Sequence, residues 1–137
     1  MTAKHTREQV ERFLKTQQTM RLATVREDGA PHVVPVWYMY ENGAFYVGTH
    51  TRTAKAKNVD KTGRAAFCID VGVHSPDIFG VSGHGRASLL RDGVAAIASR
   101  ILSRYYDTMD DPAAQELLAD TDCIIRITPD SMASWSY

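Results

Sequence analysis

The residues best suited to chemistry lie in one short polar segment of the sequence. Three threonines and two lysines gather there: Thr49, Thr51, Thr53, Lys55 and Lys57. Thr53 is a typical helix cap, and the first turn of a helix offers free backbone N–H groups and the positive end of the helix dipole. Hydroxyl and ammonium donors beside such a helix start can bind a phosphate group. Taken alone, the segment fits a surface helix with solvated lysines better.

The sequence offers no convincing set of metal ligands or catalytic residues. Its five histidines show neither the His-x-x-x-His spacing nor the carboxylate pairing of a zinc site: His5, His32, His50, His74 and His84. Cys68 and Cys123 lie inside apolar runs and are expected to be reduced core residues. No nucleophile stands beside a suitable base, so the catalytic side chain stays unknown. Such a chain can still be an enzyme if a cofactor supplies the reactive atoms.

The bulk composition predicts one globular domain over residues 1–137. Hydrophobic residues make up 44% of the chain and charged residues 23%, which allows a buried core. Lys plus Arg and Asp plus Glu number 16 each, so net charge gives no reason to expect nucleic acid or a membrane surface as a partner. No apolar run approaches the roughly 20 residues that span a bilayer. Because the first residues also lack signal-peptide character, we expect a cytoplasmic protein.

The first half of the sequence predicts a helix followed by an antiparallel meander. Thr6 and Gln9 have the spacing of a capping box, which predicts a helix over residues 7–17. Strands are expected next, over residues 21–25, 32–40 and 44–49. Two glycine-containing turns separate them and are typical of hairpins: Glu27-Asp28-Gly29 and Glu41-Asn42-Gly43.

The second half predicts three more strands and three more helical segments. They are expected in this order: a helix over 53–59, a strand over 64–71, a strand over 78–90 bent at its glycines, a helix capped by Asp92, a helical turn at Asp111-Pro112 and a last strand over 123–127. Six strands joined mainly by hairpins, with helices set aside at one edge, predict an α+β fold with a closed or nearly closed antiparallel barrel.

Several segments, taken in this order, resemble a known family. Residues 20–37, MRLATVREDGAPHVVPVW, resemble the opening of the pyridoxamine 5'-phosphate oxidase-like split-barrel superfamily. The resemblance continues through shorter motifs: Gly48-Thr49, TAKAKN over 53–58, GRAA over 63–66 and VSGHGRA over 81–87. It implies a six-stranded antiparallel split β-barrel with peripheral helices, and a homodimer with two cofactor sites at the subunit interface. The family cofactor is usually FMN, the deazaflavin F420 in a large branch, and haem in a minority.

The sequence departs from the true oxidases where they bind the FMN phosphate. Three cationic positions of that phosphate site are occupied here by Val34, Met39 and Ala54. The C-terminal arginine pair that holds the pyridoxal phosphate substrate is absent as well. These departures argue against pyridoxamine phosphate oxidation, since charge-assisted contacts to phosphate are the strong ones. The motif PHVVPVW over residues 31–37 looks more like the F420-dependent branch, and FMN stays open.

The resemblance also implies where the cofactor binds. It places the flavin or deazaflavin ring at Pro35, Val36 and Trp37, with backbone groups reading the pyrimidine edge of the ring. By itself, Trp37 fits a core aromatic residue better. Trp135 either packs at the end of the barrel or closes over the ring from the partner subunit. With the resemblance added, the threonines and lysines of residues 49–57 become the expected phosphate site.

These expectations combine into two hypotheses of different classes. The first is an oxidoreductase that uses F420 or FMN to transfer a hydride to an unidentified small, electron-poor substrate. The second is a flavin, deazaflavin or haem binding or carrier protein without turnover. Either protein would be a homodimer.

Overall fold

The computed structural model of the protein describes residues 5–137. Four helices are present in this part: α1 (Arg7–Thr16), α2 (Ala54–Thr62), α3 (Val94–Leu102) and α4 (Pro112–Asp120). Seven strands form one antiparallel sheet: β1 (Met20–Val25), β2 (Pro31–Val36), β3 (Met39–Glu41), β4 (Ala44–Thr49), β5 (Arg64–Val71), β6 (Phe79–Leu90) and β7 (Cys123–Ser136). The strand order is β2-β1-β5-β6-β7-β4-β3. The predicted α+β class and antiparallel order are therefore confirmed.

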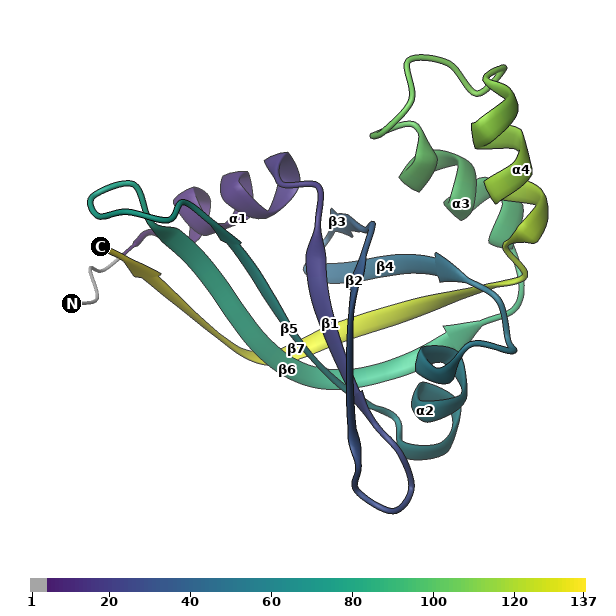
Figure 1. Cartoon of the computed structure of the whole chain (residues 1–137), viewed down its shortest axis with the longest axis horizontal. Helices are drawn as coiled ribbons and strands as arrows, with labels where there is room; N and C mark the ends of the chain where they lie inside the picture. Colours follow the sequence, from purple (N-terminus) through teal and green to yellow (C-terminus); the bar gives the residue numbers. More distant parts are fainter. Residues whose placement is uncertain (1–4) are drawn as a thin grey trace.

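The sheet curls into a half-barrel along its two longest strands. β6 and β7 pair over their whole length, and Figure 1 shows α1 and the C-terminus near one end of this pair, with α2, α3 and α4 near the other. The register of the pair shifts between His84 and Gly85. A Cβ on Gly85 would lie 2.1 Å from the Thr128 carbonyl oxygen, so glycine is required for this close approach. The predicted bend of the strand at its glycines is confirmed.

The number of strands differs from the prediction because one long strand is broken. The expected strand over residues 32–40 is two strands, β2 and β3, which Trp37 and Tyr38 separate. The sheet order places β2 and β3 at opposite edges of the sheet, so these two residues carry the chain from one edge to the other. The prediction of six strands is wrong for this reason, and the sheet has seven.

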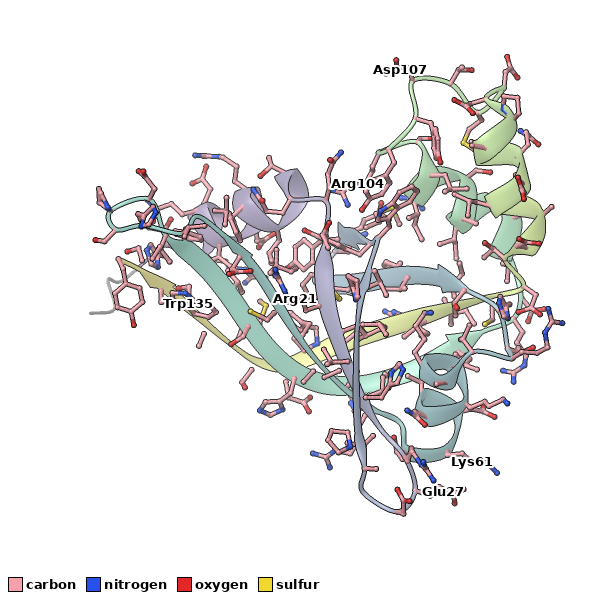
Figure 2. All side chains as sticks on the ribbon, in the orientation of Figure 1. Arg21, Glu27, Lys61, Arg104, Asp107 and Trp135 are labelled. Carbon is pink, nitrogen blue, oxygen red and sulfur yellow. The ribbon has the colours of Figure 1, made fainter. Side chains whose placement is uncertain are left out.

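Two neighbouring side chains bind the backbone at this break. Tyr38 donates its N–H to the Tyr105 hydroxyl over 3.0 Å, and the Arg104 guanidinium donates to the Tyr38 carbonyl. Arg104 also donates to the carbonyls of Lys15 at 2.9 Å and Gln17 at 2.5 Å, at the end of α1. Figure 2 shows Arg104 between the start of β1 and α3. The segment after α3 therefore joins α1 to the broken strand.

The predicted helices are present, with changed ends. The capping box of α1 is confirmed, since Thr6 and Gln9 bond each other's backbone N–H groups. α2 continues to Thr62 and ends at Gly63, whose φ of 67° is the left-handed conformation that glycine adopts readily. Gly93, and not Asp92, is the N-cap of α3. The turn expected at Asp111-Pro112 is the nine-residue helix α4.

The last strand is longer than predicted. The expected strand ended at residue 127, but β7 continues to Ser136 because β6 supplies a partner along its whole length, from Leu90 opposite Ile124 to Phe79 opposite Ser136. Pro129 does not end β7, because it lies beside the bulge where the register with β6 shifts. A proline signal in the sequence was thus overruled by pairing with a distant strand.

Buried side chains form two clusters. The larger cluster fills the concave side of the sheet under α1 and includes Leu14, Tyr38 and Phe45. The smaller one joins α3 to β3 and β7 through Met39, Ile101 and Ile124. Both cysteines are free, Cys123 buried and Cys68 half-buried. Within residues 5–137, no helix is long and apolar enough to cross a membrane.

We predict that Arg104→Met destabilises the protein by about 1.5–3 kcal/mol, the range for hydrogen bonds to charged groups. The change keeps an apolar stem but removes the Arg104 donor from three backbone carbonyls, of which that of Tyr38 keeps the Tyr105 hydroxyl at 3.2 Å. Urea unfolding measures the free energy. The control is Arg100→Met in α3, which removes only the exposed ion pair with Glu41 and should cost about 0.2–1 kcal/mol. Equal losses in the two variants would contradict this role of Arg104.

Candidate functional site

The candidate site is a pocket of about 440 Å³ between the sheet and three of the helices. Pro35, Val36 and Trp37 line it from the end of β2, and Lys55 lines it from the first turn of α2. Residues of α3 and α4 form the facing wall. The fold thus brings residues 35–37 and Lys55 to one pocket. The resemblance had assigned them to the same cofactor.

Lys55 is the charged group of this pocket. It follows Thr53, which caps α2 by accepting the N–H of Ala56 at 3.3 Å. The Lys55 side chain is half-buried, and burial lowers the pKa of its ammonium group. Burial also raises the pKa of the nearby Cys123 thiol to about 11, so that thiol stays neutral and provides no counter-charge. Among residues 5–137, no carboxylate forms an ion pair with Lys55.

The three threonines shape the loop before α2 and do not line the pocket. Thr49 and Thr53 join their hydroxyls at 3.1 Å, and Thr53 donates to the His50 carbonyl at 2.9 Å. Thr51 donates its N–H and hydroxyl to the two carboxylate oxygens of Asp122, at 2.8 and 3.2 Å. These bonds hold the loop in place and so set the position of Lys55. Sequence reasoning missed Asp122, which follows α4 and meets the loop only in the fold.

Two other residues expected at the site lie away from the pocket. Lys57 is exposed on α2 and is not a lining residue. Trp135 packs on Gly80, where an added Cβ would come within 2.3 Å of the indole. Figure 2 shows Trp135 near the C-terminus, at the end of the molecule opposite α2 and its Lys61. Trp135 can therefore reach such a pocket only from a second copy of the chain.

The end of β2 supplies a flat surface and free backbone groups. Trp37 is 39% exposed, so the interpretation as a core aromatic residue is wrong. Its ring stacks on Tyr105 with centroids 4.2 Å apart and an interplanar angle of 7°. Within residues 5–137, β2 is an edge strand that pairs with β1 alone, so its outer edge carries backbone groups without a strand partner. Pro31 and Pro35 offer only carbonyl acceptors, because proline has no N–H. These free backbone groups can form hydrogen bonds with the polar side of a planar ring ligand.

The facing wall is apolar and comes from α3 and α4. It consists of Ala98, Ile101, Leu102 and Leu117, with Thr121 at its border. The sequence predicted a helix after Asp92 but gave no means to tell its core contacts from its pocket contacts. In the fold this helix serves both purposes, since Ile101 also packs against Ile124 in the smaller core cluster. Sequence reasoning therefore missed this wall.

The pocket fits a flat aromatic group that carries an anion. It combines an apolar slot, an edge of backbone groups and a single half-buried ammonium without a counter-charge. Within residues 5–137, no three His, Cys, Asp or Glu side chains gather in a group that could hold a metal ion.

Solved structures with the same fold carry different functions. A conserved hypothetical protein from Mycobacterium tuberculosis is 23% identical, with a TM-score of 0.85, 97% of this chain and 86% of that chain covered. An F420 reductase is 24% identical, with a TM-score of 0.68 and coverages of 90% and 94%. The haem storage protein HutZ from Vibrio cholerae is 15% identical, with a TM-score of 0.74 and coverages of 95% and 93%. At these identities the likeness shows the fold alone.

The sequence comparisons define the family. No curated protein matches the sequence. The sequence profile of the pyridoxamine 5'-phosphate oxidase family matches residues 6–136, nearly the whole chain. The predicted resemblance to the split-barrel superfamily is confirmed by this match and by the shared fold. The chain therefore belongs to the pyridoxamine 5'-phosphate oxidase family.

Proposed function

We propose that this protein is an oxidoreductase that binds F420, in preference to FMN, in the pocket between β2, α2 and α3. The observation that carries the proposal is Lys55, a half-buried ammonium group that lines the pocket without an ion-pair partner among the described residues. A partly buried charge without a partner lowers stability, and an anionic ligand at this position would offset that cost. The substrate would be a small, electron-poor molecule.

Each part of the pocket has one task in this proposal. Lys55 binds the phosphate of the cofactor, and the loop held by Asp122 keeps α2 and Lys55 in place. The outer edge of β2 at Pro35–Trp37 bonds the polar edge of the ring. The apolar side chains of α3 and α4 exclude water from the ring. When bound, the cofactor supplies a hydride at its ring, and the protein supplies orientation and a dry environment.

The preference for F420 over FMN rests on the charge of the phosphate group that Lys55 would contact. The phosphate monoester of FMN carries close to two negative charges at neutral pH, whereas the phosphodiester of F420 carries one. The pocket lining contains one cation, Lys55. The three places where the oxidases carry additional cations are the half-buried Val34, the core residue Met39 and the exposed Ala54. A single ammonium matches a singly charged phosphodiester better. The F420 reductase with this fold agrees with the proposal without deciding it.

A binding role without turnover is the second candidate, and one observation favours haem as its ligand. His50 is half-buried in the loop before α2, and its Nδ1 atom has no hydrogen-bond partner in the described part of the chain. Imidazole is a common axial ligand of haem iron. His50 is not a lining residue of the pocket, which makes this the weaker candidate.

We further propose a homodimer of single-domain subunits. On the convex face, Val33 of β2 lies beside Ala23 of β1, which lies beside Ala66 of β5. Val33 is 66% exposed, and its cross-strand neighbours Ala23 and Ala66 carry small apolar side chains. A second copy packed on this face would bury Val33. Such a copy is also the only means by which Trp135 could approach a pocket.

The deciding experiment is a fluorescence titration of the ligand-free protein with F420 and, separately, with FMN. We expect tighter binding of F420. Lys55→Met should weaken F420 binding by about 1.5–3 kcal/mol, or roughly tenfold to a hundredfold in Kd, through loss of a charged hydrogen bond.

The matched control for this titration is Lys61→Met, the same change in the exposed last turn of α2. It should leave the affinity unchanged. Binding of neither cofactor by wild type would sink the proposal, and a Soret band after incubation with haem would favour the second candidate. Equal losses in the two lysine variants would remove Lys55 from the phosphate site.

The partial burial of Lys55 also predicts that the free energy of unfolding depends on pH. Burial lowers its folded-state pKa below the ordinary 10.5, so the unfolded chain binds this proton more tightly than the fold does. The resulting penalty is fully present at neutral pH and disappears as the pH rises through the lowered pKa toward 10.5. Ligand-free Lys55→Met should therefore be more stable than wild type at pH 7, and the difference should shrink at alkaline pH. Because solvent screens the half-exposed ammonium group, the gain should not exceed about 1 kcal/mol.

Chemical denaturation at a series of pH values measures this difference, with Lys61→Met as the control for general charge effects. A Lys55→Met variant that is less stable than wild type at pH 7 would show that Lys55 has a stabilising role in the fold. Saturating F420 should reverse the order of stability, because the ligand stabilises wild type by mass action.

The dimer predicts a mass of two chains by light scattering at micromolar concentration. Val33→Glu should shift the protein to monomers, because it places a charge in the proposed apolar interface. Val73→Glu is the matched control, since Val73 is 81% exposed in the turn between β5 and β6. Monomeric wild type would refute the dimer.

A further inference from the structure

We infer that Tyr105 is a positioning residue for the ring end of the pocket, acting through Trp37. The inference rests on the proposed function, because it assigns a role in binding the cofactor ring. Tyr105 lies just beyond α3 and is not itself a lining residue. Trp37 lines the pocket and stacks on Tyr105. Tyr105 thus reaches the pocket only through Trp37.

The stacking geometry shows that Tyr105 defines the plane of Trp37. The two rings are nearly parallel, at 7°, with centroids 4.2 Å apart. Tyr106 adds an edge contact to Trp37 at 5.9 Å and 64°. Trp37 lies in the link between β2 and β3, where no strand partner fixes its backbone. Its orientation therefore depends on these aromatic contacts.

Hydrogen bonds in turn fix Tyr105. Its hydroxyl donates to the Gln18 carbonyl at 2.7 Å and accepts the Tyr38 N–H at 3.0 Å. The Arg104 guanidinium lies 3.3 Å from the same oxygen. Burial raises the pKa of Tyr105, so the hydroxyl keeps its proton at neutral pH. One side chain thereby bonds the backbone next to Trp37 and also supports the Trp37 ring.

The consequence is a pre-organised surface for a planar ligand. A tryptophan that is 39% exposed and unsupported would sample several rotamers, and binding would then have to order it. Ordering such a side chain lowers affinity, and rigid support avoids this loss. We therefore assign Tyr105 an effect on ring affinity that is separate from the phosphate contact of Lys55.

The test uses Trp135→Phe as the background, so that Trp37 is the remaining tryptophan. Two variants are made in it: Tyr105→Leu, which removes the stack and the hydroxyl, and Tyr105→Phe, which keeps a ring and removes only the hydroxyl. Each is titrated with F420 and with its ribityl deazaflavin fragment, which lacks the phosphate and tail. Tyr106→Phe is the control, since it keeps the edge contact with Trp37.

We expect Tyr105→Leu to weaken both ligands by the same factor, about three- to tenfold, the size of a lost aromatic pairing. Tyr105→Phe should weaken both by a smaller common factor. Lys55→Met, in contrast, should weaken F420 and leave the fragment unchanged. The Trp37 emission of the ligand-free Tyr105→Leu variant should move to longer wavelength as the ring gains solvent. If Tyr105 had only a structural role, Tyr105→Leu would lower the unfolding midpoint without weakening both ligands by the same factor.

The outcomes separate this inference from the proposed function. If wild type binds neither ligand, the proposed function fails and the inference fails with it. Suppose instead that wild type binds both ligands and that the two Tyr105 variants bind the fragment as tightly as the protein with Tyr105 does. The inference alone is then overturned. If Tyr105→Leu does not fold, Tyr105→Phe decides.

Discussion

The structure depends on how the chain crosses from one edge of its sheet to the other. β2 and β3 lie at opposite edges, and only Trp37 and Tyr38 connect them. At this point neither strand can accept the N–H or satisfy the carbonyl of Tyr38, and unpaired polar groups in the interior are costly. Arg104 and Tyr105 supply the missing partners. The half-barrel can therefore be split at this position only because the segment after α3 returns to it.

This requirement couples the fold to the pocket. Arg104 also binds the last carbonyls of α1, so one side chain joins α1, the broken strand and the segment after α3. The break exposes Trp37 at the pocket, and β2 is left as an edge strand with free backbone groups. Lys55 differs from these residues, because its partial burial disfavours its charged form in the ligand-free state. Side-chain hydrogen bonds therefore satisfy the backbone at the break, whereas the Lys55 ammonium group forms no ion pair among residues 5–137.

Local signals predicted most elements, and long-range pairing decided the remainder. The capping box at Thr6, the glycine turns and the apolar alternation located the helices and strands to within a few residues. The errors arose where a distant segment intervened. The expected strand over 32–40 breaks because its two halves pair with β1 and with β4, and β7 extends past Pro129 because β6 continues beside it. Neither partner is visible from the local sequence.

The sequence by itself determined the family resemblance, the antiparallel α+β class and the first turn of α2 as a candidate anion site, since helix caps, hairpin turns and motif order depend on neighbouring residues. The tertiary structure decided which of those residues share a pocket. It brings Lys55 together with Pro35–Trp37 and joins Thr51 to Asp122 at the surface. It also places Trp135 at the far end of the molecule. Arg104, Tyr105 and the wall from α3 and α4 had no local signal, because their partners are brought near only when the sheet curls.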